Sequence, residues 1–118
     1  MPTSPQDSTA APQYLPLPDI AEALGVLVTK VHQLLRERCL LAVRVDGVRK
    51  VPAEFIADAS VVKGLPGTIT LLSDAGFTDE EIIDWLFAAD PTLPGRPIDA
   101  LRENRRTEVR RRAQSAGF

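Results

Sequence analysis

The chain has 118 residues, of which 44% are apolar and 25% are charged, and its formal net charge is −2. This length allows one compact domain with a tail, or two small units that share a core. No apolar run approaches the roughly 20 residues of a membrane span, which excludes a transmembrane protein. A single cysteine, Cys39, excludes an internal disulfide framework and a cysteine zinc cluster, and it predicts a cytoplasmic location. One histidine and one cysteine are too few for a metal site.

The modest net charge conceals a strong block pattern. Residues 30–50 carry six basic side chains against two acids, and residues 65–94 carry six acids and no base. Residues 95–118 carry seven arginines against three acids. Such an asymmetric distribution indicates charged partners more directly than the overall charge does.

The first predicted elements are a tail and a short helix. Residues 1–13 are rich in Pro, Ser, Thr, Gln and Ala without an apolar period, and they lack the basic start and apolar core of a secretory signal. We expect this segment to be disordered. An extended piece should follow at residues 14–17. Asp19 and Glu22 have the spacing of a reciprocal cap, which predicts a helix that ends at Gly25.

A second helix is predicted over about residues 28–38. Val28, Val31, Leu34 and Leu35 form one apolar face at helical spacing. A helix, a four-residue turn and a second helix have the spacing of a helix-turn-helix. The second helix would be the recognition helix, and Cys39 would pack at its end. Its remaining faces offer hydrogen-bonding side chains to a DNA major groove: Thr29, Lys30, His32, Gln33 and Arg36.

A hairpin is predicted directly after this helix. An Asp-Gly pair separates two strand-like runs at residues 41–45 and 48–51, a strong signal for a two-residue turn. Such a turn places Arg44 directly opposite Arg49. Like charges in that position are destabilising, so the pair indicates an anion lying over the hairpin. We interpret the hairpin as a wing whose cations contact DNA phosphates: Arg44, Arg49 and Lys50.

The rest of the chain is predicted to be helical. Residues 53–59 should form a short helix that returns to the core, and residues 65–76 a longer one. Thr78 and Glu81 have the spacing of a capping box at the start of a third, acidic helix, in which Trp85 is expected in the core. The last helix should run from Ile98 to about Ala116.

The arginines of the last helix have two possible roles. We expect them to pair with the acidic helix at residues 79–84, since opposite charges would orient the two helices. If they contact DNA phosphates instead, the secondary candidates are Arg105, Arg106, Arg110, Arg111 and Arg112.

The predicted fold class is therefore mainly α with a small β-hairpin wing. It comprises a disordered tail (1–13), a winged helix-turn-helix (14–60) and a C-terminal helical region packed on it (61–118). No phosphate loop, nucleophile elbow or metal motif is present, so we expect neither an enzyme nor a cofactor. The pattern favours a protein that binds double-stranded DNA, and it predicts a transcriptional regulator that is a monomer or weak homodimer. The alternative is a winged-helix protein-interaction module with little or no DNA affinity.

Two resemblances extend this interpretation. The stretch "LPDIAEALGVLVTKVHQLLRERCLLAVRVDGVRKVPAEFI" resembles the winged helix-turn-helix of the excisionase/MerR type. That family usually begins its recognition helix with Ser and then Arg, where this chain has Leu27 and Val28. Because a cap and a cation are missing there, we expect backbone contacts to dominate DNA binding, with modest sequence discrimination.

The stretch "KGLPGTITLLSDAGFTDEEIIDWLFAADPTLPGRPIDALRENRRTEVRRRAQSAGF" resembles the C-terminal region of a small actinobacterial family of winged helix-turn-helix DNA-binding proteins. In the mycobacterial member a Ser/Thr protein kinase phosphorylates a threonine in the N-terminal tail, which is linked to reduced DNA binding. By position, the resemblance implies phosphorylation at Thr9, with Thr3, Ser4 and Ser8 as competitors. A phosphate adds about −1.5 to −2 charges, which would compete with DNA for the cationic face.

Overall fold

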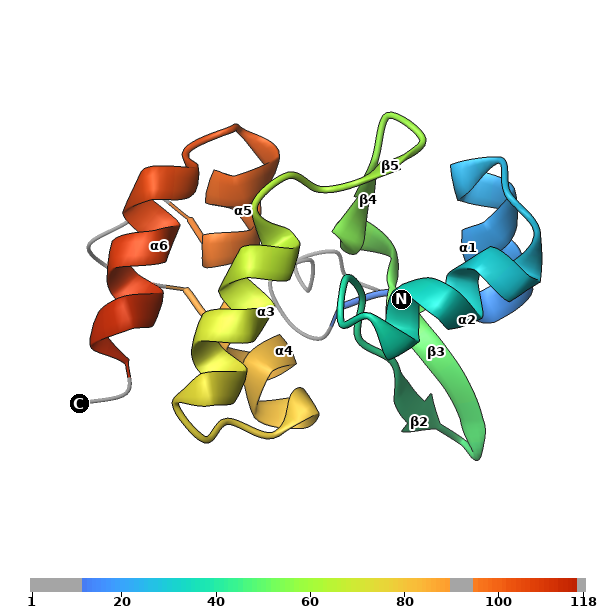
Figure 1. The fold of residues 1–118 in the computed structure, drawn as a ribbon, viewed down its shortest axis with the longest axis horizontal. Coiled ribbons are helices and arrows are strands. Elements are labelled where there is room, and N and C mark those ends of the chain that lie inside the picture. Colours follow the sequence, from blue (N-terminus) through green and yellow to red (C-terminus); the bar gives the residue numbers. More distant parts are fainter. Residues whose placement is uncertain (1–11, 90–94, 117–118) are drawn as a thin grey trace, which may run out of the picture.

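A computed structural model describes residues 12–89 and 95–116. This part of the chain contains six α-helices, a three-stranded antiparallel sheet and a second, two-stranded hairpin (Figure 1). The expected class, mainly α with a small β wing, is confirmed. Within these residues no helix has both the length and the apolar character needed to cross a membrane.

The N-terminal half is a helix-turn-helix set against a small sheet. In chain order its elements are β1 (Tyr14–Pro16), α1 (Leu17–Leu24), α2 (Val28–Arg36), β2 (Val43–Val45) and β3 (Val48–Pro52). The sheet order is β1-β3-β2, with Leu15 opposite Val51. The extended piece expected near Tyr14 therefore adds a third strand, which anchors the wing to the start of the fold.

Helix α1 begins earlier than the sequence suggested. Its N-cap is Pro16, and Asp19 lies inside the first turn instead of capping the helix, so the predicted cap was wrong. The reason is Pro18 in the first turn, where a residue without an N–H loses no helical hydrogen bond and its fixed φ suits the helix. Gly25 ends the helix in the left-handed conformation (φ 70°), as expected.

The predicted helix over residues 53–59 is also wrong. A single 3-10 turn at Ala53–Phe55 is followed by a hairpin of β4 (Ile56–Ala57) and β5 (Ser60–Val61). Asp58 and Ala59 both have positive φ, 52° and 60°, which is the backbone of a two-residue hairpin turn.

The C-terminal half is helical. It consists of α3 (Leu65–Asp74), α4 (Asp79–Phe87), α5 (Pro97–Arg102) and α6 (Arg106–Ser115). The capping box before α4 is confirmed: the Glu81 N–H donates to Thr78 Oγ1 at 3.2 Å, and the Thr78 N–H donates to Glu81 Oε1 at 2.8 Å. The single helix expected from Ile98 onward is in fact two helices. Asn104 breaks it with φ 66°, a conformation that asparagine tolerates better than most residues.

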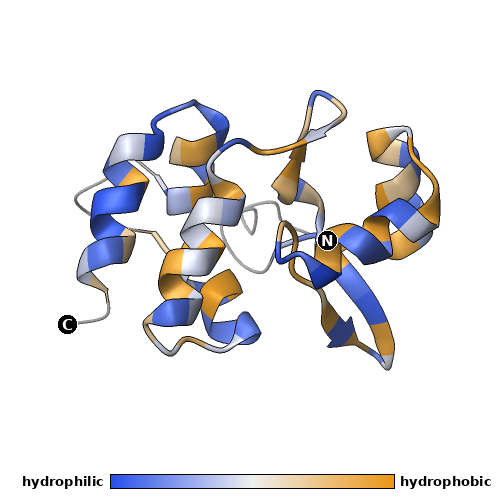
Figure 2. Cartoon of the chain, in the orientation of Figure 1, coloured by the Kyte–Doolittle hydropathy of each residue, from blue (hydrophilic) through white to orange (hydrophobic). Residues whose placement is uncertain are grey.

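One apolar core joins the two halves. It includes Ile20, Val31 and Val51 from the N-terminal half together with buried side chains of α3 to α6. The rings of Phe55 and Phe87 meet across the junction, with centroids 5.9 Å apart. Trp85, expected in the core, is half-buried and packs against it. Apolar colour recurs on α1, α3, α4 and α5, whereas α6 is mostly hydrophilic (Figure 2).

Candidate nucleic-acid interface

Helix α2 has the two faces that a recognition helix needs. Val31 is fully buried, and Leu34 and Leu35 pack against the core beside it. The predicted contact residues lie on the other sides of the helix. Three of them are exposed and two are half-buried; the exposed ones are Thr29, Lys30 and Arg36, and the half-buried ones are His32 and Gln33.

These side chains are not equally available. The Gln33 amide donates a 2.9 Å hydrogen bond to Glu37 Oε2, so the amide is engaged and a carboxylate lies beside it. Within residues 12–89 and 95–116, the side chains of Lys30 and Arg36 have no hydrogen-bond or ion-pair partner. Two cations of α2 can therefore reach phosphates without breaking an existing bond.

The wing has the predicted register. Arg44 lies opposite Arg49, and the turn residues Asp46 and Gly47 both have positive φ, 54° and 81°. This is the turn that matches the twist of a two-residue hairpin. Arg44 Nη1 donates to the Gly47 carbonyl at 3.0 Å, so this guanidinium folds over the turn at the tip of the wing.

The register separates the wing cations that the sequence grouped together. Lys50 lies opposite Val43 and is adjacent in sequence to Arg49, so its side chain faces the other side of the sheet. Arg49 shares its face with Val51, which is fully buried in the core. The arginine pair therefore lies on the face of the sheet that carries the buried Val51, and Lys50 lies on the opposite face.

Sequence reasoning missed an exposed apolar patch at the start of α2. Leu27 is the N-cap residue, makes no side-chain cap and is 78% exposed. Val26 and Val28 beside it are exposed at 37% and 38%. The side chains at this end of a recognition helix are the ones that contact base edges. Three consecutive apolar residues in a turn were the available signal.

The pairing expected between the C-terminal arginines and the acidic helix is wrong. Helix α6 packs on α3 and α5. Asp79 of α4 pairs with Arg38 of the N-terminal half, and Arg105 pairs with Glu103 and Glu108 close by in its own segment. The break at Asn104 is the physical reason, because it redirects the chain and sets α6 along α3.

The five arginines named as secondary candidates for DNA contact consequently differ in their exposure. Arg105 and Arg112 are half-buried, while Arg106, Arg110 and Arg111 are exposed. Helix α6 lies at the end of the molecule away from the wing (Figure 1).

Arg96 ties the winged part to the C-terminal helices. Its Nη2 lies 2.7 Å from Glu54 Oε1 and 2.7 Å from Asp99 Oδ1, and its guanidinium lies over the Phe87 ring, 5.4 Å from the centroid. Bonding to Asp99 raises the pKa of Arg96, and the same bond holds the pKa of Asp99 below its ordinary value. A partly buried ionic cluster thus joins the 3-10 turn that follows β3 to the start of α5.

Other expected features cannot be placed. Thr9, with its competitors Thr3, Ser4 and Ser8, lies outside the described residues. In the part of the chain that the structure does describe, no three His, Cys, Asp or Glu side chains gather in a way that could hold a metal ion.

Known proteins resemble both halves of the chain. Residues 5–56 match the family described as "DNA-binding protein Rv2175c, wHTH domain", and residues 62–117 match "Rv2175c C-terminal domain of unknown function". The DNA-binding protein Rv2175c of Mycobacterium tuberculosis (strain ATCC 25618 / H37Rv) is 44% identical over 115 residues, covering 86% of this chain and 79% of the relative.

A shorter match concerns the winged part alone. An excisionase of Streptomyces ambofaciens is 35% identical over 51 residues, 43% of this chain and 82% of that protein.

Among solved structures, the NMR structure of Rv2175c superposes with a TM-score of 0.82 at 42% identity, covering 92% of this chain and 84% of the other.

Proposed function

The chain belongs to the family of the DNA-binding protein Rv2175c, and on that premise we propose that it binds duplex DNA through α2 and the β2–β3 wing as a cytoplasmic transcriptional regulator. The observation that carries the proposal is the register of Arg44 opposite Arg49 directly after α2. Neither guanidinium pairs with a carboxylate among the described residues. Opposed like charges destabilise a hairpin, and DNA phosphates over the pair would offset that cost.

In this arrangement the wing and the helix have different roles. The arginine pair, together with Lys30 and Arg36 of α2, would contact phosphates, which position a protein on DNA without reading its sequence. Thr29 and His32 would lie nearer the base edges, with Gln33 released from Glu37 on binding.

The apolar end of α2 suits a particular base contact. Leu27 and Val28 expose aliphatic surface where recognition helices meet base edges. The only apolar group that the major groove offers is the methyl group of thymine. We expect these two side chains to favour thymine at one position of the bound site, while the missing cap and cation keep discrimination modest.

The tail supplies the proposed regulation. Thr9 precedes β1, and β1 pairs with wing strand β3, so the tail joins the fold at the sheet that carries the arginine pair. A phosphate at Thr9 added by a Ser/Thr protein kinase would then compete with DNA phosphates for these cations. A kinase reaction on the full chain followed by mass spectrometry should place the phosphate on Thr9 and lower DNA affinity. Phosphate found only outside residues 3–9 would rule out this assignment.

Binding itself is tested with a fluorescently labelled duplex and the full chain, by anisotropy at several salt concentrations. We expect saturable binding that weakens as salt rises. Absence of binding even at low salt would contradict the proposal and favour the protein-interaction module. Sedimentation at the same concentrations checks the expected monomer or weak homodimer.

A further inference from the structure

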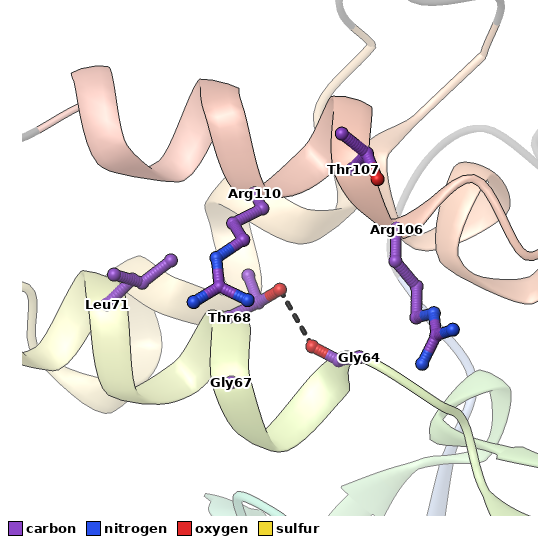
Figure 3. A pocket seen from close by; sticks show the side chains of 7 residues that line it. All are labelled: Gly64, Gly67, Thr68, Leu71, Arg106, Thr107 and Arg110. Carbon is purple, nitrogen blue, oxygen red and sulfur yellow. Dashed lines mark hydrogen bonds between the residues drawn. The ribbon is translucent and has the colours of Figure 1, made fainter.

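A groove between α3 and α6 has the composition of an anion site. Its volume is about 370 Å³, and Figure 3 shows the side chains that line it. The two helices that form it lie on the side of the molecule away from the wing (Figure 1). Among residues 12–89 and 95–116, no acidic side chain lines the groove. The lining residues are Gly64, Gly67, Thr68, Leu71, Arg106, Thr107 and Arg110.

Two arginines that have no partner among the described residues face this groove. Arg106 and Arg110 are one helical turn apart on α6, and Figure 3 shows them reaching toward α3 on either side of Gly64. In the described part of the chain neither side chain has a hydrogen-bond or ion-pair partner. Other arginines of this half are engaged: Arg96 with Glu54 and Asp99, and Arg102 with two backbone carbonyls.

The backbone at the start of α3 lies against the side chain of one of these arginines. Gly64 has φ +86°, and a Cβ placed on it would lie 2.8 Å from Cγ and 2.9 Å from Cδ of Arg106. The stem of Arg106 therefore rests directly against the start of α3, which only glycine permits. A Cβ on Gly67, one turn further, would meet nothing within 4 Å.

The groove also receives the N-terminal ends of two ten-residue helices. Gly64 is the N-cap of α3, and Thr107 lies in the first turn of α6. The Leu65 N–H already donates to the Val62 carbonyl at 3.1 Å and Pro66 has no N–H, so α3 contributes mainly the partial positive charge of its N-terminal end, as α6 does. Two arginines, the Thr107 hydroxyl and two helix ends thus converge on one cavity, and none of its described lining residues is acidic.

We propose that this groove binds phosphate groups. Because the two guanidinium groups lie on either side of Gly64, the groove suits an anion with more than one phosphate. These phosphate groups belong either to a small diphosphate-bearing molecule or to consecutive backbone positions of DNA. Arginine binds such oxyanions through paired hydrogen bonds, and Leu71 adds an apolar wall for the remainder of the ligand. This site is independent of the proposed contacts of the wing.

The test is a ¹H–¹⁵N NMR titration of the full chain with inorganic pyrophosphate, at constant ionic strength maintained with sodium chloride. We expect saturable shifts at the amides of Gly64, Gly67 and Thr107. Arg106→Gln with Arg110→Gln should weaken binding about tenfold or more, since each removes a charged hydrogen-bond donor. The matched control is Arg111→Gln, an exposed arginine of the same helix that does not line the groove, which should keep the affinity.

A second titration, with duplex DNA, distinguishes the sources. Shifts with pyrophosphate identify a free anion as a ligand. Shifts at the same amides with DNA alone, reduced by the double substitution, identify backbone phosphates. If neither ligand shifts these amides, or if Arg111→Gln weakens binding as much as the double substitution, the proposal is overturned. Failure of DNA binding at the wing would leave the pyrophosphate result standing, so the two proposals fail separately.

Discussion

Arg38 and Asp79 join the segment just after α2 to the start of α4. Arg38 Nη2 donates to Asp79 Oδ1 at 2.9 Å, and Nη1 donates to Oδ2 at 3.2 Å. Arg38 itself has φ 62°, a left-handed conformation that favours glycine. A two-bond ionic contact between the halves is thus formed by a residue whose backbone is strained.

The substitution Arg38→Gly separates these two effects. The side chains are 41% and 38% exposed, so the ion pair contributes no more than about 1 kcal/mol. Relief of the left-handed strain contributes about 1 kcal/mol in the opposite direction. We expect the free energy of unfolding in urea to change by less than about 1 kcal/mol. Asp79→Asn, which loses the pair without relieving strain, should be the more destabilising of the two. The reverse order would show that glycine relieves no strain at this position, because both variants lose the pair.

Arg44→Gln with Arg49→Gln should weaken DNA binding and flatten its salt dependence. Each lost phosphate contact reduces the slope of log K against log salt by about 0.9. Folding stability should not fall and should rise slightly, because opposed like charges are removed from the hairpin. Anisotropy titrations and urea unfolding measure the two quantities. An unchanged slope would exclude the arginine pair from the interface. Arg111→Gln, which removes one charge from α6 at a distance from the wing, serves as the control.

Leu27→Ser should stabilise the protein by about 1 kcal/mol, since serine can accept the hydrogen bond that the N-cap of α2 now lacks. The same change should remove the preference for thymine, because the aliphatic contact is lost. Thermal unfolding tests the first effect. For the second, the bound duplex is compared with one in which uracil replaces each thymine. Equal affinity of the unaltered protein for both duplexes would contradict the methyl contact.

Stability should fall in acid through Asp99. Arg96 lowers the pKa of this carboxyl below 3.8, the value of an unperturbed aspartate. The folded state therefore binds the proton less tightly than the unfolded state. The contribution is complete above the unfolded pKa and is lost as pH falls through the lower folded pKa. Urea unfolding between about pH 5 and pH 2 should show a smaller decline for Asp99→Asn than for the unaltered chain. If the free energy of unfolding falls equally with pH in both proteins, Asp99 is not the source of the acid sensitivity.

Two glycines in the first part of α3 should respond oppositely to alanine. Gly64→Ala forces a Cβ into Arg106 at a backbone conformation with φ +86°, so we expect a loss of about 2 kcal/mol or more. Gly67→Ala meets open space inside a helix and should gain up to about 1 kcal/mol. Urea unfolding of the two variants provides the comparison. Similar losses for both would show that contact between the new Cβ and Arg106 does not cause the loss of stability.

The winged half follows closely from local patterns. The 3.6-residue period of Val31, Leu34 and Leu35 and the Asp-Gly pair each specify one structure over a few residues, and both predictions are confirmed. The capping box at Thr78 is equally local and equally confirmed. Hydrogen bonds within one turn need no distant partner, so the order of residues determines them.

The failed predictions share a different cause. Residues 53–59 and the stretch after Ile98 have compositions compatible with a helix, but Asp58, Ala59 and Asn104 take left-handed backbones that no short motif announces. Such conformations persist only where surrounding contacts compensate their cost. Lys50 is a different case, because the predicted register already implied that it faces away from the arginine pair, and the structure has that register.

The amino-acid sequence alone thus determined that the protein is mainly helical, that a cationic hairpin follows an amphipathic helix, and which cations that hairpin carries. Only the tertiary structure decided that Asp79 pairs with Arg38, that α6 lies on α3, and that Arg106 and Arg110 face one groove. The physical reason is the distance along the chain between the residues that interact. Helix periods, caps and tight turns are specified by neighbours in the chain. Which charges meet depends on how the helices pack around the shared core, and the distribution of charge along the chain does not determine that packing.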